Sequence, residues 1–420
     1  IVTSGMVISI LNVLVVLLKM AFGFILTKYV AMNMGPAGVA LFGQLQSLVS
    51  LFQNIPHGIP NGVISNTATV KDESTMSHWS WWLSSIQICF LIYVLLLITC
   101  FFNVEISNFI FKRSDFNSFY ILLVLLYPLF HLYSLGNAMN TGLLKFKQYL
   151  VLNIVSMISY IILVLVFYYV NGSVDVFLAS IFFIPFCGII VFSFTSIPYL
   201  KQIKLKRFIE SKQLKCLLKY FCATSLSIFL APIVLMVIRN SLIENYGEIV
   251  AGNWQAMWRV SEIYTAVITL GLSAIILPRF ARAQNYKETI LVLKEVIFFA
   301  LPVLLVSVIV VYFGKDVWLP LLYSDEFSVP DEFFLFQLPG DILKVGCWLL
   351  SYLILSKQKL RLYATLEVSF SLLFAMLTLL ATDLFGVVGV PIAYLATQLL
   401  CLILLIWWLC FVFKKESSKV

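Results

Sequence analysis

The chain has 420 residues, of which 61% are hydrophobic and only 11% are charged. Soluble domains contain roughly 45–50% apolar and roughly 25% charged residues, and a mean hydropathy of +1.00 leaves no polar region that could cover a soluble surface. This composition excludes an ordinary soluble protein and predicts an all-α polytopic membrane protein. The net charge of +8 would point to nucleic acid in a soluble protein, but in a membrane protein Lys and Arg gather in cytoplasmic loops instead.

Apolar stretches long enough to cross a bilayer recur along the whole chain. A hydrocarbon core of about 30 Å needs about 20 apolar residues per helix. Polar punctuation between the stretches predicts about twelve transmembrane helices, at 6–28, 38–65, 81–102, 118–143, 149–170, 174–199, 220–241, 251–278, 295–313, 333–355, 362–382 and 387–413. The first stretch is predicted to be a retained helix and not a signal peptide.

The basic residues are divided unevenly between the two sides of these helices. With the N-terminus inside, twenty Lys and Arg residues fall in cytoplasmic segments and four on the opposite side. This bias predicts that both termini are cytoplasmic. The net charge of +8 is therefore explained by the concentration of Lys and Arg on the cytoplasmic side, and nucleic acid is not expected as a partner.

The longest basic stretch divides the predicted helices into two sets of six. We expect an N-terminal lobe at 1–200, a basic cytoplasmic linker at 201–219 and a C-terminal lobe at 220–420. No loop is long enough to form a catalytic domain, and no GxxxxGK[ST] motif is present to bind a nucleotide. The eight cysteines form no CxxC pair, so they are interpreted as small buried hydrophobes, and no metal or cofactor is expected.

Seven charged residues remain inside the predicted spans, where a charge costs about 2.5–3.5 kcal/mol even on insertion scales. They carry a net charge of +1 and are Lys19, Arg239, Arg259, Glu262, Asp341, Lys344 and Glu367. Two pairs of these residues are three residues apart: Arg259 with Glu262, and Asp341 with Lys344. One interpretation is that each pair is a structural ion pair. The other is a hydrated central cavity whose cations meet an anion and whose acids Glu262, Asp341 and Glu367 balance them or carry a coupling proton. Arg239 and Glu367 lie near helix ends and could instead reach the membrane surface.

An uncharged polar stripe follows the helix predicted at 38–65. Amide and imidazole side chains on such a face either hold helices together or line a lumen that binds sugar hydroxyls. The candidates for sugar contact are Gln44, Asn54, His57 and Asn61, joined by Asn137 of the helix predicted at 118–143. His57 is also the histidine to test as a proton carrier, although its favoured interpretation is a packing histidine.

Three short patches resemble a known family. They are Gly340-Asp341-Ile342-Leu343-Lys344-Val345-Gly346 with the preceding Phe336-Gln337-Leu338, Trp254-Gln255 through Ser261-Glu262, and Met34-Gly35-Pro36-Ala37-Gly38 with Pro60-Asn61-Gly62-Val63. These patches resemble the Wzx-type flippases of bacterial lipid-linked oligosaccharides, such as the O-antigen and enterobacterial common antigen flippases. The chain departs from that pattern where Glu262 replaces an expected Asp and Arg259 lies beside it.

The resemblance implies the fold of the multidrug/oligosaccharidyl-lipid/polysaccharide (MOP) exporters, with two six-helix lobes around a central cleft. It implies a flippase of the bacterial inner membrane and no enzyme activity. The substrate would be an undecaprenyl-pyrophosphate-linked oligosaccharide of the O-antigen type, used in lipopolysaccharide biosynthesis. Lys19, Arg239, Arg259 and Lys344 would bind its pyrophosphate. Membrane lipids, the O-antigen polymerase and the chain-length regulator are the other expected partners, and the alternative is a cation-coupled multidrug antiporter of the same fold.

Overall fold

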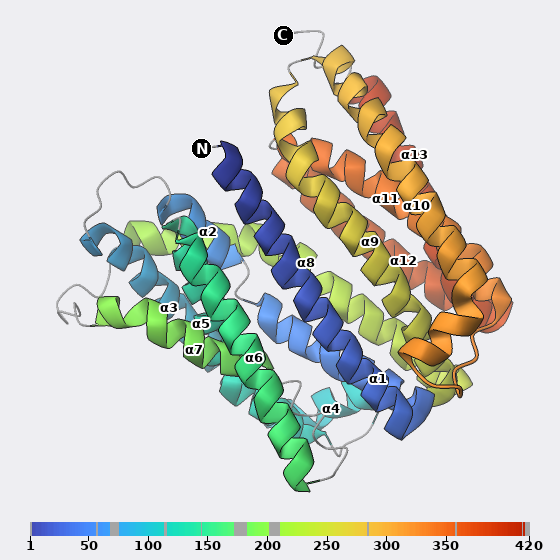
Figure 1. Cartoon of the computed structure of the whole chain (residues 1–420), viewed down its shortest axis with the longest axis horizontal. Helices are drawn as coiled ribbons and strands as arrows, with labels where there is room; N and C mark the ends of the chain where they lie inside the picture. Colours follow the sequence, from blue (N-terminus) through green and yellow to red (C-terminus); the bar gives the residue numbers. More distant parts are fainter. Residues whose placement is uncertain are drawn as a thin grey trace. The chain divides into compact units, whose positions relative to one another are not determined.

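Nearly all the residues that the computed structural model describes are helical (Figure 1); these described residues are 2–55, 58–67, 75–112, 116–143, 145–171, 183–200, 211–283, 285–357, 359–413 and 415. Helices satisfy all their backbone hydrogen bonds internally, which is what a lipid environment demands. By length and composition, six described segments could cross a membrane: Ser80–Phe111, Asn117–Gly142, Lys147–Val166, Tyr286–Leu322, Asp331–Ser356 and Arg361–Phe411. The last contains two successive helices.

The helices fall into two compact units. Unit 1 comprises residues 1–19 and 43–236, and unit 2 comprises residues 20–42 and 237–420. The first helix, α1 (Val2–Asn54), and the eighth, α8 (Ser211–Tyr246), each contribute to both units. The expected lobe boundaries at residues 200 and 220 stay a prediction. Within the expected linker, residues 211–219 are helical and form the first turns of α8.

Unit 1 is completed by α2 (Gly58–Thr67), α3 (Thr75–Thr99), η1 (Cys100–Phe102), α4 (Asn103–Phe111), α5 (Asn117–Gly142), α6 (Phe146–Asn171) and α7 (Phe183–Leu200). Its main packing is between α5 and α7. A methyl group added to Gly188 would lie 2.3 Å from the Leu129 carbonyl oxygen. Glycine at this position therefore lets the two backbones approach closely, as small residues do between membrane helices.

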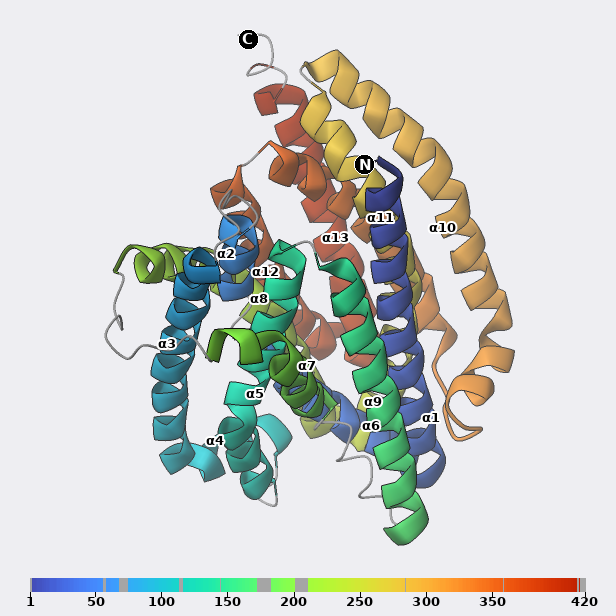
Figure 2. The same ribbon diagram turned by 60° about the vertical axis from the view of Figure 1, so that its left-hand side comes forward.

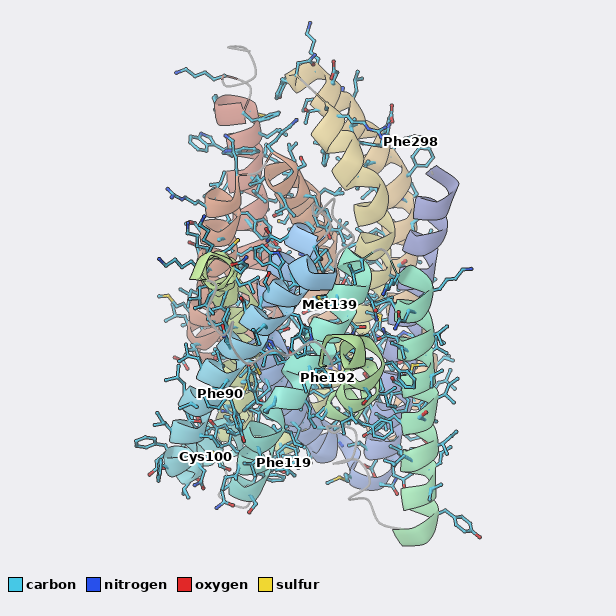
Figure 3. The ribbon with its side chains drawn as sticks, turned by 90° about the vertical axis from the view of Figure 1, so that its left-hand side faces the viewer. Phe90, Cys100, Phe119, Met139, Phe192 and Phe298 are labelled. Atoms are coloured by element: carbon cyan, nitrogen blue, oxygen red, sulfur yellow. The ribbon has the colours of Figure 1, made fainter. Side chains whose placement is uncertain are left out.

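Unit 2 contains α9 (Glu248–Arg282), α10 (Tyr286–Leu322), α11 (Asp331–Ser356), α12 (Leu360–Phe385), η3 (Gly386–Val388), α13 (Gly389–Trp407) and η4 (Trp408–Phe413). The most extensive contacts join α11 with α13 and α12 with α13, and α9 packs against α10 and α11. Figure 2 shows α10 curving along its length. Figure 3 shows Phe298 of α10, which is 74% exposed, as expected for a side chain that faces lipid.

The segment of α1 in unit 2 is kinked at Gly35, which has φ 61° and ψ −161° and precedes Pro36. Glycine adopts a positive φ without steric cost, and proline cannot continue the hydrogen-bond ladder. A methyl group added to Gly252 of α9 would lie 1.8 Å from the Pro36 carbonyl oxygen, so the kink packs directly on the α9 backbone. Lys28 lies within α1, and its ammonium group donates to the carbonyls of Pro320 and Leu321 at the end of α10.

Candidate functional site

The intramembrane charges of unit 2 lie on four helices. Arg239 is on α8, Arg259 and Glu262 are on α9, Asp341 and Lys344 are on α11, and Glu367 is on α12. Lys19 lies in the part of α1 that belongs to unit 1, and its side chain is outside the described residues. Among residues that the structure describes, no group of three His, Cys, Asp or Glu could hold a metal ion.

Arg239 is buried and bonded, so it does not extend to a membrane surface. Its side chain is only 1% exposed. Nε and Nη2 both donate to Oε1 of Gln255, over 3.1 and 2.6 Å. The guanidinium also lies 5.9 Å from the centre of the Trp254 ring, within the range of a cation–π interaction. A neutral amide and an aromatic ring thus both contact Arg239 and orient its guanidinium group.

Arg259 and Glu262 form the ion pair that their spacing predicted. Arg259 Nη1 lies 2.9 Å from Glu262 Oε2, and both side chains are about one third exposed, at 33% and 31%. The other carboxylate oxygen of Glu262 accepts a hydrogen bond of 2.9 Å from Trp258 Nε1. The pair therefore has a fixed orientation and stays accessible on one side.

Asp341 is completely buried and receives hydrogen bonds from three side chains. Tyr394 donates to Oδ1 over 2.8 Å, Gln337 donates to the same oxygen over 3.4 Å, and Tyr264 donates to Oδ2. An ionised carboxylate accepts hydrogen bonds and donates none, so three donors match its needs. The three partners come from α9, α11 and α13 and hold these helices to one acidic side chain.

Lys344 points toward aromatic rings instead of toward Asp341. Its Nζ lies 5.6, 5.0 and 5.9 Å from the ring centres of Trp258, Trp348 and Tyr394. Within the described part of the chain, Lys344 forms no ion pair with a carboxylate. The electron-rich faces of the rings attract the ammonium charge, while Asp341 and Glu367 interact with it electrostatically without forming a direct ion pair among the described residues.

Trp258 connects the two sets of charges. Its indole N–H binds Glu262, its ring faces Lys344, and its ring packs edge-on against Tyr394 with centres 5.2 Å apart. It also stacks on Phe374 at 5.8 Å. We call Arg239, Arg259, Glu262, Asp341 and Lys344 the charge cluster. Its formal charge is +1, and the excess charge is oriented by aromatic rings and an amide.

The remaining predicted site residues are Glu367 of unit 2 and the polar residues of unit 1. Glu367 is half-buried and hydrogen-bonds Tyr363 of its own helix. In unit 1, Gln44 is 1% exposed and donates to the carbonyls of Ile110, over 2.9 Å, and Met236, over 3.4 Å. These contacts join α1 to α4 and α8, which is the packing role.

The other members of the polar stripe have mixed surroundings. Asn54 donates to Ser50 over 3.2 Å, Asn61 is exposed, and Asn137 accepts from Asn153 over 2.9 Å. His57 lies outside the described residues. Asn61 is therefore the stripe residue whose described surroundings leave most room for a ligand.

Three partners of the charge cluster were not predicted from the sequence: Tyr264, Gln337 and Tyr394. Gln337 precedes Asp341 by four residues, so helical spacing alone could have placed it on the same face. Tyr264 and Tyr394 lie on other helices. No local pattern signals that these two hydroxyls converge on Asp341.

Replacing Trp258 with Phe is expected to lower transport severalfold, and replacing it with Leu roughly tenfold. Phe keeps a ring beside Lys344 but removes the N–H that orients Glu262, whereas Leu removes both interactions, each worth about 0.5–1 kcal/mol. Trp318→Phe is the matched control, because that indole also donates a hydrogen bond, to the Val311 carbonyl, outside the cluster. The apparent KM should rise more than the maximal rate falls. Equal effects of Phe and Leu with unchanged KM would mean that Trp258 only supports the fold.

Replacing Gln44 with Leu is expected to lower the free energy of unfolding by about 1–2 kcal/mol, because two interhelical hydrogen bonds are lost in a buried position. Thermal unfolding of the purified protein measures this change. Asn61→Leu serves as the exposed comparison and should leave unfolding nearly unchanged. If Gln44→Leu unfolds like the parent chain but alters substrate affinity, the packing role is wrong.

Solved structures define the class of protein. An inward-facing multidrug resistance MATE family transporter of the MOP superfamily aligns with a TM-score of 0.77, at 13% identity over 96% of this chain and 95% of that one. A MOP superfamily transporter from Pyrococcus furiosus, described as having a binding pocket of reverse polarity, aligns with a TM-score of 0.65, at 12% identity over 96% and 94% of the two chains. The chain thus has the MOP exporter fold predicted from its sequence, and it is a multi-pass membrane protein.

The polysaccharide biosynthesis protein family matches residues 8–284, and the chain belongs to this family. The chain is also similar to the Lipid III flippases of Escherichia coli (strain K12) and Shigella flexneri, each 25% identical over 402 residues that cover 93% of this chain and 96% of the relative. The resemblance to Wzx-type flippases, predicted from three short patches, is confirmed by these comparisons.

Proposed function

We propose that the chain flips an undecaprenyl-pyrophosphate-linked oligosaccharide of the O-antigen type from the cytoplasmic to the periplasmic leaflet of the bacterial inner membrane. Its family, and the flippases that it resembles over nearly its whole length, support the class of substrate. The observation that carries the proposal is Lys344, a cation at mid-membrane that is surrounded by rings and belongs to a cluster with an excess positive charge.

A pyrophosphate supplies the negative charge that this cluster lacks. Charge-assisted hydrogen bonds are strongest in a confined region of low dielectric constant. Arginine binds phosphate oxygens in a bidentate manner, and lysine acts as a point charge. In the proposed complex, Lys344 and Arg259 meet the pyrophosphate, with Arg239 contributing to the same positive field; Lys19 of unit 1 stays a phosphate-binding residue predicted from the sequence. Glu262 and Asp341 limit the excess charge when no substrate is bound.

The sugars would meet polar side chains of unit 1, of which Asn61 is the exposed candidate and Asn54, His57 and Asn137 are neighbours in the sequence pattern. Amides hydrogen-bond sugar hydroxyls as both donors and acceptors. The lipid tail would stay in the bilayer while alternating access moves the head group. The O-antigen polymerase and chain-length regulator would act on the product at the outer surface.

The direction of transport requires no ion gradient in this proposal. A membrane potential that is negative inside favours outward movement of an anion by about 2.3 kcal/mol per charge per 100 mV. Removal of the product by polymerisation would add to this driving force. Coupling to a proton on Asp341, Glu262 or Glu367 is the competing arrangement. It predicts that dissipating the pH gradient at constant membrane potential stops transport.

The location of lipid-linked repeat units in cells without the protein tests the proposal. We expect such cells to accumulate these units in the cytoplasmic leaflet and to lack the surface polymer, with both defects restored by the parent chain. Accumulation of single units on the outer face would instead indicate a polymerase defect. Unchanged glycan export with lost efflux of cationic drugs would overturn the proposal in favour of the multidrug antiporter.

A further inference from the structure

An apolar groove lies on unit 2 between α10, α11 and α13. It encloses about 270 Å³ and is lined by aliphatic side chains, Ala300 and Gly346. Leu293 and Leu304 mark its two ends on α10, and Ile342 and Leu350 mark them on α11. Leu402 of α13 and Leu409 of η4 mark them on the third side. All three helices belong to segments long and apolar enough to cross a membrane.

The lining of this groove is suited to bind hydrocarbon and not water. A buried water needs two to four polar partners, and the lining side chains provide none. A dry cavity of about 150 Å³ already holds a benzene ring, so the groove has room for a longer stretch of hydrocarbon. Ile297 and Leu301 line it and are each 40% exposed, so the groove is open along α10. The outward Phe298 of the same helix is visible in Figure 3.

The groove extends over the depth of one leaflet. From Leu293 to Leu304 the rise along α10 is roughly 16 Å at about 1.5 Å per residue, which is about half of the 30 Å hydrocarbon core. The end marked by Leu293, Leu350 and Leu409 is the one predicted to face the cytoplasm. Lys294 directly follows Leu293 and is exposed. A positive charge therefore lies where the head group of a lipid in the groove would be.

The groove residues and Lys344 lie on different sides of α11, so the lipid tail of a substrate bound at Lys344 is not expected in the groove. At 100° per residue, Ile342 and Gly346 lie about 160° around the helix from Lys344. A lipid whose phosphate contacts Lys344 would therefore have its tail on the other side of α11. We propose that the groove binds an acyl chain of an anionic phospholipid from the inner leaflet. This lipid fills the space behind the helix that carries Asp341 and Lys344.

Photolabelling of the full-length chain tests this proposal. The chain would be reconstituted in vesicles of phosphatidylcholine that contain a small fraction of phosphatidylglycerol with a photoreactive acyl chain, and labelled peptides would be mapped by mass spectrometry. We expect labelling concentrated on the groove faces of α10, α11 and α13. Gly346→Leu and Ala300→Phe, which fill the groove, should each reduce this labelling roughly tenfold. Val306→Phe is the control, because Val306 is 60% exposed on α10 outside the groove.

A second measurement identifies which lipid supplies the acyl chain in the groove. Lys294→Gln should abolish the preference for phosphatidylglycerol over an equally photoreactive phosphatidylcholine. Labelling that is spread evenly over α10, or unchanged in both filled variants that remain folded, would overturn the proposal. Stronger labelling by a photoreactive polyprenyl pyrophosphate than by phosphatidylglycerol would overturn it in favour of the substrate tail. The binding measurement is independent of transport, so its failure leaves the proposed function standing.

Discussion

Replacing Lys344 with Gln is expected to lower export of the lipid-linked oligosaccharide roughly tenfold to a hundredfold. The ammonium group lies beside three aromatic rings and forms no direct ion pair in the part of the chain that the structure describes. A hydrogen bond to a charged group contributes about 1.5–3 kcal/mol, and each 1.4 kcal/mol corresponds to a tenfold change in binding. Gln preserves much of the side-chain volume but removes the charge. Lys344→Arg should keep part of the activity, because it keeps the charge while changing the position of its donors.

Lys315 provides the matched control for Lys344. It also lies near two aromatic rings, those of Tyr312 at 5.1 Å and Phe334 at 5.8 Å, but it forms an ion pair with Asp331 near the end of α10. Lys315→Gln should leave export near the parent level. Surface glycan per molecule of membrane protein is the measurement, with protein abundance and thermal unfolding recorded for each variant. Equal export by Lys344→Gln and the parent chain would contradict the role of Lys344.

Replacing Asp341 with Asn is expected to destabilise unit 2 by about 2–4 kcal/mol and to reduce export in proportion to the folded protein that is lost. The side chain is fully buried, and Tyr264, Gln337 and Tyr394 all donate to it. An Asn side chain replaces one accepting oxygen with an NH₂ group. It therefore places donor against donor and leaves a buried polar group unsatisfied. Thermal unfolding in detergent measures the loss.

Two milder variants separate the structural role of Asp341 from a role in transport. Tyr264→Phe and Tyr394→Phe each remove one donor and should cost only about 1 kcal/mol. Because the carboxylate keeps its other donors, both variants should export nearly as well as the parent. If Asp341→Asn unfolds like the parent chain yet stops export, the carboxylate acts directly in transport, and proton coupling would become the favoured mechanism.

Hydropathy alone was sufficient to predict the class of protein, because the lipid environment constrains composition so strongly. The sequence also located the charge cluster, since charged residues in apolar stretches are rare and easily recognised. The interruption near Gly35 was predicted as a gap between two helices, and in the structure the backbone of α1 is non-helical at Gly35, where a kink separates two helical parts. The basic stretch was expected to be a loop, but its residues 211–219 continue as helix because straight-chain Lys, Gln and Leu favour that conformation.

The partners of each charge were only partly predictable. Arg259 and Glu262 are three residues apart, and this local spacing is sufficient for their ion pair. Asp341 and Lys344 have the same spacing, but Tyr394 of α13 contacts both of them, and Trp258 of α9 lies beside Lys344. Which residues of α9 and α13 face α11 depends on tertiary packing. Local periodicity shows which residues share one face of a helix, but it does not show which other helix packs against that face.

The rings around Lys344 also bear on how quickly a ligand could exchange. An aromatic face attracts the positive charge without occupying the three N–H groups of the ammonium as a carboxylate would. An arriving oxyanion can therefore take up these N–H groups by displacing water, with no ion pair to break first. Departure requires only that water returns to the same positions. A cation held by rings thus favours rapid loading and unloading, which suits a carrier that must release its cargo in every cycle.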